Sequence, residues 1–183
     1  MRRSRALPPL YPGTNNICVN SFGPECLGRD YSSIDSGMAS TAWTADLLVF
    51  VPLVLVQSVT IAQFFWRNGA TVNGNTDVGV YDETGTVKLA STGATANSGT
   101  SVIQTVNITD AQLGANTRYW LALGSDSATQ TYLIANPVVS ALDYIGVLQQ
   151  AAGYSAGLPT STTFAVPSVA VLPMFGFTGN AVI

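Results

Sequence analysis

The acidic side chains are the first candidates for chemistry. Asp77, Asp82 and Glu83 lie close together and offer the oxygen ligands that a hard cation such as calcium prefers. Their spacing does not match an EF-hand loop, and the residues around them are typical of a turn. A pair such as Asp82 and Asp126 could support glycoside hydrolysis across a cleft, but no local pattern favours it. We therefore predict a solvated hairpin turn and no metal site.

The other side chains that catalysis uses are scarce. The chain has no histidine, which removes the commonest metal ligand and any Ser-His-Asp triad. Lys88 is the only lysine, and its place beside the predicted turn favours the surface over a buried Ser-Lys dyad. No Gly-rich phosphate loop followed by lysine occurs. We expect no catalytic residues and no cofactor, so the sequence predicts a protein that is not an enzyme.

The cysteines leave two interpretations open. Cys18 and Cys26 are the only two in the chain, which excludes a Cys-rich zinc site. They lie in a stretch rich in Gly, Asn and Pro and could close a small disulfide loop in an oxidising compartment. Two buried free thiols fit the sequence equally well.

Charge is the most informative bulk property. Charged residues make up 9% of the 183 residues and apolar ones 47%, whereas about 25% of a typical soluble domain is charged. Such a surface suits a protein that packs beside many other subunits, although a low-charge secreted domain would look similar. The net charge is −3 although Arg2, Arg3 and Arg5 form a basic tip, so the remaining body is acidic. An acidic body argues against nucleic acid as the main partner.

Membrane segments and export signals are not evident in the sequence. The longest apolar run, Leu47 to Val56, contains Pro52 and is far shorter than the roughly 20 residues that a spanning helix needs. Pro8, Pro9 and Pro12 interrupt the position where a secretory signal would have its apolar core. We therefore expect no membrane partner.

Residues 1–45 differ in texture from the rest of the chain. They contain many Pro and Gly residues and no sustained periodicity, yet they are richer in apolar side chains than disordered tails usually are. We predict an extended N-terminal arm that anchors the chain to a partner, followed by one domain over residues 46–183. In the alternative, the segment folds back over its own domain. The predicted anchoring residues are Arg2, Arg3, Arg5, Leu10, Tyr11, Ile17, Phe22 and Tyr31.

From Trp43 onward the pattern indicates short β-strands separated by turns. Tyr119, Leu121 and Leu123 should face one side of a strand, and Trp120 and Ala122 the other. In the strand at 59–66, one face should carry Val59, Ile61, Gln63 and Phe65, and the other Thr60, Ala62, Phe64 and Trp66. No convincing long helix appears, so we predict an all-β, antiparallel β-sandwich of jelly-roll type. The predicted strands cover residues 47–56, 59–66, 77–82, 87–90, 101–109, 117–123, 131–135, 164–172 and 174–177, with a helix or loop at 141–152.

Three tyrosines are the best candidates for contact with a ligand. Tyr132, Tyr144 and Tyr154 lie in or beside the segment that is rich in loops. Exposed aromatic rings can stack on sugar rings, so each is a candidate glycan contact. Aromatic side chains in such positions also close a core or a subunit interface, and that alternative applies to all three.

Two motifs resemble a known group of domains. The run Gly79-Val80-Tyr81-Asp82-Glu83-Thr84-Gly85 is followed, after a Thr-rich segment, by Arg118-Tyr119-Trp120-Leu121-Ala122-Leu123. This order resembles the jelly-roll domain of bacteriophage minor structural proteins, such as head-fibre, decoration and tail-fibre proteins. The resemblance covers roughly residues 45–135, and related sandwiches occur in bacterial carbohydrate-binding modules.

The resemblance implies a role on the surface of the virion. We expect a non-enzymatic capsid-associated decoration, vertex or head-fibre subunit whose partners are other virion proteins and further copies of itself, as a homotrimer or another symmetric cluster. A tail-fibre or tail-tip module that binds host surface glycans is the alternative. A secreted carbohydrate-binding module is a third reading, which would need an export signal and a catalytic partner domain.

Overall fold

The computed structural model describes residues 16–20, 23–26, 38–135 and 139–181, and it is an all-β protein with antiparallel strand pairing throughout. Its single described helix, α1 (Val139–Tyr144), is short. The strands are β1 Asn16–Asn20, β2 Gly23–Cys26, β3 Ala39–Ala42, β4 Leu48–Val54, β5 Val59–Arg67, β6 Asn75–Tyr81, β7 Lys88–Ser91, β8 Thr95–Ala96, β9 Ile103–Leu113, β10 Arg118–Ser125, β11 Thr131–Ala135, β12 Leu148–Gln150, β13 Leu172–Pro173 and β14 Phe175–Ala181. The predicted all-β, antiparallel class is thus confirmed.

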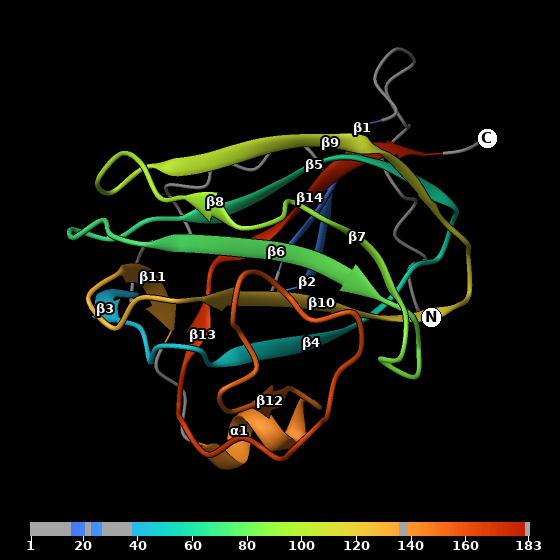
Figure 1. Ribbon diagram of the computed structural model, residues 1–183. Helices are drawn as coiled ribbons and strands as arrows, with labels where there is room; N and C mark the ends of the chain where they lie inside the picture. The colour runs from blue at the N-terminus through green and yellow to red at the C-terminus, as the bar shows by residue number, and fades with distance from the viewer. Residues whose placement is uncertain (1–15, 21–22, 27–37, 136–138, 182–183) are drawn as a thin grey trace, which may run out of the picture.

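Two larger sheets and one small sheet make up the part of the chain that the structure describes. The first sheet has the strand order β2-β1-β14-β5-β9, and the second has β12-β4-β10-β6-β7, with β8 continuing the edge beside β6. Figure 1 shows β5, β9 and β14 on one side of the molecule and β4, β6 and β10 on the other. The small sheet, β13-β11-β3, lies at one end of the second sheet.

The main core lies between the two larger sheets. Phe64 and Phe177 of the first sheet and Val80 and Leu121 of the second belong to one buried apolar cluster. Along β10 the side chains alternate as the sequence predicts: Tyr119, Leu121 and Leu123 enter this cluster, whereas Trp120 and Ala122 join a second one on the opposite face. The second sheet is therefore covered on both faces, which explains why β10 is apolar at nearly every position.

One predicted strand has its faces assigned wrongly. Strict alternation places Ile61 and Phe65 on one face of β5 and Phe64 on the other. In the structure Ile61 and Phe64 enter the same core cluster, because the pairing with β9 shifts between Ile61 and Gln63. A β-bulge of this kind reverses which face the following side chains occupy, and periodicity alone does not reveal it.

The hairpin of β6 and β7 is confirmed. Asp82 shapes its turn, because its backbone N–H donates to Val87 O at 3.0 Å and its side chain accepts from Val87 N at 3.0 Å. Gly85 has a φ of 73°, which an L side chain rarely adopts. The sequence Asp82-Glu83-Thr84-Gly85 is therefore a turn for conformational reasons.

Pro52 occupies the edge position that its missing N–H requires. It pairs with Trp120 of β10 on one side of β4, while β12 on the other side reaches only from Leu48 to Phe50. A proline is tolerated in a strand where no neighbouring strand needs its missing N–H. This part of β4 is therefore an edge of the second sheet, with no described strand paired on its β12 side.

The described parts of residues 1–45 pair with strands of the same chain. β1 pairs with β14, β2 pairs with β1, and β3 pairs with β11. These pairings correspond to the fold-back alternative for the three strands, and the predicted boundary after residue 45 does not separate β3 from the domain. The anchoring role of the segment stays a prediction, since residues 1–15 and 27–37 lie outside the described chain.

The segment after β12 differs from the prediction. Residues 164–172 are not a strand: apart from Leu172, only Ala165 takes part in an isolated bridge, with Gln149. Instead, residues 151–166 form a covering segment whose Tyr154, Leu158 and Phe164 pack on the outer face of the second sheet. The apolar residues of this segment pack against that face, and their pattern in the sequence therefore resembles that of a strand. Figure 1 shows this orange stretch crossing in front of β10 and β4.

Candidate functional site: an open apolar surface beside β4

The carboxylates that the sequence singled out do not form a metal site. Asp77 is buried in β6, whereas in the hairpin turn Asp82 is half-buried and Glu83 is exposed. Among the residues that the structure describes, no group of three or more His, Cys, Asp and Glu side chains could hold a metal ion. The turn prediction holds for Asp82 and Glu83 but is wrong for Asp77, which belongs to the interior.

Asp77 fastens the covering segment to the second sheet. Its carboxylate accepts a hydrogen bond from Leu158 N at 2.8 Å and another from Thr92 Oγ1 at 3.0 Å. Lys88 Nζ donates to Leu158 O at 2.7 Å, so Lys88 is tied to the same residue and does not form a Ser-Lys dyad. Burial raises the pKa of Asp77 above its ordinary value, although these hydrogen bonds act in the opposite direction.

The raised pKa of Asp77 predicts a pH-dependent stability. Because the folded protein binds this proton more tightly than the unfolded chain does, the contribution of Asp77 to stability falls as the pH rises from about 3.8 through the folded-state pKa. We expect Asp77→Asn to remove this part of the pH profile. Urea unfolding at a series of pH values from about 3 to 7 measures it. Relative to wild type, Asp77→Asn should therefore gain stability as the pH rises. A difference in stability that does not change with pH would contradict the prediction, and so would a relative loss of stability by Asp77→Asn as the pH rises.

Two of the three tyrosines cannot contact a glycan. Tyr132 is 0% exposed, and its ring packs edge-on against that of Trp43 with the ring centres 5.3 Å apart. Its hydroxyl is hydrogen-bonded to Thr76 Oγ1. Tyr154 is 3% exposed and belongs to the cluster under the covering segment. Burial raises the pKa of Tyr132 to about 12. These two predicted contacts are corrected to core residues, because the small sheet and the covering segment enclose them. Tyr144, by contrast, is 92% exposed.

The predicted anchoring residues lie outside what the structure describes. Ile17 is placed only by the backbone of β1, and the other predicted anchors fall in segments that are not described. The cysteines are likewise placed by backbone alone: Ile17 pairs with Cys26, and Cys18 pairs with Glu25. The two cysteines are therefore not directly opposite each other in the ladder, and the choice between a disulfide and two thiols stays open.

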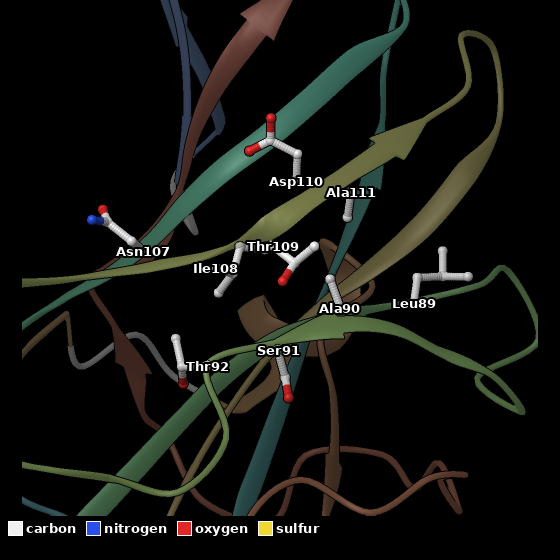
Figure 2. Close-up of a pocket in the computed structure, with 9 residues that line it drawn as sticks. All are labelled: Leu89, Ala90, Ser91, Thr92, Asn107, Ile108, Thr109, Asp110 and Ala111. Carbon is white, nitrogen blue, oxygen red and sulfur yellow. The ribbon is translucent and has the colours of Figure 1, made fainter.

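A shallow groove separates the edges of the two sheets. It has a volume of about 400 Å³ and lies between β7 and β9. Figure 2 shows Leu89, Ala90, Ser91 and Thr92 along one wall. The opposite wall is formed by residues 107–111, where Asp110 is the sole carboxylate. Hydroxyls, one amide and one carboxylate can hydrogen-bond a polar ligand, but they supply no acid and base pair for hydrolysis.

A more distinctive feature is an uncovered apolar surface on the second sheet. The outer face of β4 is buried at Leu48 and Phe50, but beyond Pro52 the covering segment no longer shields it. Val54, the last residue of β4, is 59% exposed, and Val56, just beyond the strand, is 87% exposed, whereas Leu53 and Leu55 enter the core.

The end of α1 lies beside this stretch of β4. The position of a Cβ on Gly146 would be 3.5 Å from Pro52 Cγ, and β12 leads on from there to pair with β4. Tyr144 and Ile145 directly precede this contact and are 92% and 52% exposed. We name Val54, Val56, Tyr144 and Ile145 the β4 surface. Val54 follows Pro52 by two residues and Tyr144 precedes Gly146 by two, so this contact brings the exposed side chains to one region of the surface. Exposed apolar side chains grouped in this way are typical of an interaction site.

Opposite charges border the β4 surface. Arg118 pairs with Val54 from β10, and its guanidinium lies 4.4 Å from the centre of the Trp120 ring on the same outer face. Asp143 precedes Tyr144 on α1, which Figure 1 shows on the far side of β12 from β4. Since β12 and β10 flank β4 on opposite sides, the basic group and the acidic group stand on opposite flanks of the surface.

Sequence reasoning missed this surface. The run Leu47 to Val56 reads as a strand buried on both faces, and nothing in it marks where the cover ends. Pro52 is the one signal, because a proline indicates a stretch of strand that has lost a neighbour. Tyr144 was found in the sequence, but as a sugar contact and not as part of an apolar surface.

No protein-family model matches the chain, and no curated protein and no solved structure matches it significantly. The function is therefore argued from the residues of the chain itself. Within the part of the chain that the structure describes, no helix has the length and apolar character needed to cross a membrane.

Proposed function

We propose that the chain is a non-enzymatic structural subunit of a bacteriophage particle, a capsid-associated decoration, vertex or head-fibre protein. The β4 surface is the observation that carries this proposal. Four large apolar side chains that are more than half exposed are costly on a free monomer and favourable against a neighbouring subunit. The motif resemblance around Gly79 to Gly85 and Arg118 to Leu123 supplies the phage context.

The order of the strands supports the jelly-roll part of the proposal. Eight strands in chain order are β1, β4, β5, β6, β7, β9, β10 and β14. The first, eighth, third and sixth lie side by side in one sheet, and the second, seventh, fourth and fifth in the other. This interleaving is what two Greek keys produce when they are wound into a double-sheet jelly roll, a fold used by viral capsid domains and by lectins.

The distribution of charge fits assembly as well. Between residues 38 and 181 the basic side chains are only Arg67, Lys88 and Arg118. A surface with so few charges has little electrostatic repulsion against identical or related subunits, whereas free soluble domains usually keep apart through charge. An acidic net balance argues against packaged nucleic acid as the main partner.

The composition of purified particles tests the proposal. We expect quantitative mass spectrometry of gradient-purified phage to find the chain in a fixed ratio to the major capsid protein, because a bound subunit has a defined number of sites. A ratio that stays constant through a second gradient supports the proposal. Abundant chain in the lysate but none in the particles would contradict it.

A host-glycan module of a tail fibre or tail tip is the second candidate. Tyr144 favours it, because a ring that is 92% exposed is free to stack on a sugar. Under this alternative, host surface polysaccharide binds the purified chain, and Tyr144→Ala abolishes the binding. Under the structural proposal, neither the wild type nor Tyr144→Ala binds the polysaccharide measurably.

A further inference from the structure

We propose that the β4 surface is a two-fold interface between two copies of this chain, with Arg118 of one copy beside Asp143 of the other. The inference rests on the proposed structural role and goes beyond it by naming the partner at this surface. It concerns the second sheet and the end of α1, and it uses no residue of the groove between β7 and β9.

The layout of the surface is self-complementary. In an interface with two-fold symmetry, each patch meets its own copy, so a group on one flank meets the group on the opposite flank. Arg118 on the β10 flank and Asp143 on the α1 flank have opposite charges, and Val54 of β4 lies between the two flanks. A second copy rotated about an axis through the middle of the patch therefore opposes unlike charges at both flanks and apolar side chains at the centre.

The side chains at the centre are of the kinds that dominate such interfaces. Tyr144 is a large ring that loses little conformational entropy on binding, and it is fully available. Val54, Val56 and Ile145 provide apolar area around it. Phe164, which is only partly buried, packs on Phe50 and Trp120 at 5.1 and 4.7 Å beside the patch and gives it a rigid border.

Arg118 is already held on the correct face. Its guanidinium lies over the Trp120 ring, so less side-chain freedom is lost when it meets a carboxylate. A copy of the same chain is favoured over an unrelated partner, because this chain itself carries both members of each charge pair.

Sedimentation velocity of the full-length chain over a concentration series is the first part of the test. We expect reversible dimerisation, and Val54→Glu should weaken it at least about tenfold by placing carboxylates in the apolar centre. Val102→Glu is the matched control, because Val102 is 46% exposed at the start of β9, on the other sheet. It should leave the dissociation constant unchanged.

Reversal of the two charges is the second part. Arg118→Glu and Asp143→Arg should each weaken the dimer about tenfold or more, because each opposes like charges twice in a symmetric pair. The double variant restores unlike pairs and should dimerise within about threefold of wild type. Circular dichroism and thermal unfolding establish that each variant is folded before the association is measured.

Three results would overturn the inference: a monomeric wild type, a trimer, or a double variant that stays as weak as the single ones. These outcomes are separate from those for the virion role. A chain that occurs in particles but is monomeric when purified contradicts the two-fold interface alone, and a dimer that is absent from particles contradicts the virion role alone.

Discussion

Asn68→Ala should lower the free energy of unfolding by about 3–4 kcal/mol. Asn68 is 1% exposed, and its side-chain amide takes part in four hydrogen bonds. It accepts from Trp66 Nε1 and Gln130 Nε2, both at 3.0 Å, and donates to Ser98 O and Gln104 Oε1 at 2.8 and 3.1 Å.

The cost arises from both polarity and volume. Ser98 O loses its bond from the Asn68 amide, while Trp66 Nε1 retains a bond to Asn97 Oδ1 and Gln130 Nε2 retains one to Thr131 O. The truncation also leaves a small cavity beside Trp66, which is 0% exposed. Urea unfolding followed by tryptophan fluorescence measures the change.

Asn107→Ala is the control for this prediction. Asn107 is an exposed amide on β9 with one side-chain hydrogen bond, from Gln63 Nε2 at 2.6 Å. Its removal should cost less than about 1 kcal/mol. A similar loss for Asn68→Ala and Asn107→Ala would show that the buried network contributes little.

Gly79→Ala should destabilise the fold by about 3 kcal/mol. A Cβ at Gly79 would lie 2.7 Å from the backbone oxygen of Ala90, 2.7 Å from Ser91 Cβ and 2.9 Å from Leu158 Cδ1. β6 is held between β10 and β7, so the backbone of Ala90 cannot move away without loss of ladder hydrogen bonds. The glycine of the Gly79 to Gly85 motif is thus required by the close approach of Ala90 and Ser91 of β7, together with Leu158.

Gly114→Ala is the matched control. The nearest atoms to a Cβ at Gly114 are Tyr119 Oη at 3.5 Å and Thr117 Oγ1 at 3.7 Å, which is ordinary van der Waals contact. The same chemical change there should alter stability by less than about 1 kcal/mol. A thermal melt of both variants decides the matter: equal midpoints would contradict the close approach at Gly79.

Much of the fold follows from local pattern, and the exceptions have identifiable causes. The alternation of Tyr119 and Trp120 indicated which cluster each would enter, because a strand covered on both faces still alternates. The hairpin at Asp82 to Gly85 was predictable because its turn residues act locally. The faces of β5 were wrong beyond Ala62, since a bulge is set by the pairing with β9 and leaves no mark in the sequence of β5.

The functional site was less predictable because it depends on which segments cover which faces of the sheets. Tyr132, Tyr144 and Tyr154 are alike in sequence, but the small sheet and the covering segment bury the first and the third and leave Tyr144 free. In the same way, Phe50 and Val54 are equivalent positions of β4 until the covering segment shields only Phe50. Such differences arise from contacts between distant segments, which a single sequence does not encode locally.

The central claim, that this chain is an assembled subunit of a phage particle, is tested most directly by electron cryomicroscopy. Maps of particles made with and without the gene for this chain would be compared. The account predicts difference density at symmetry-related positions, each lobe fitting the double-sheet sandwich of β1 to β14. Identical maps, with the chain soluble in the lysate, would contradict it.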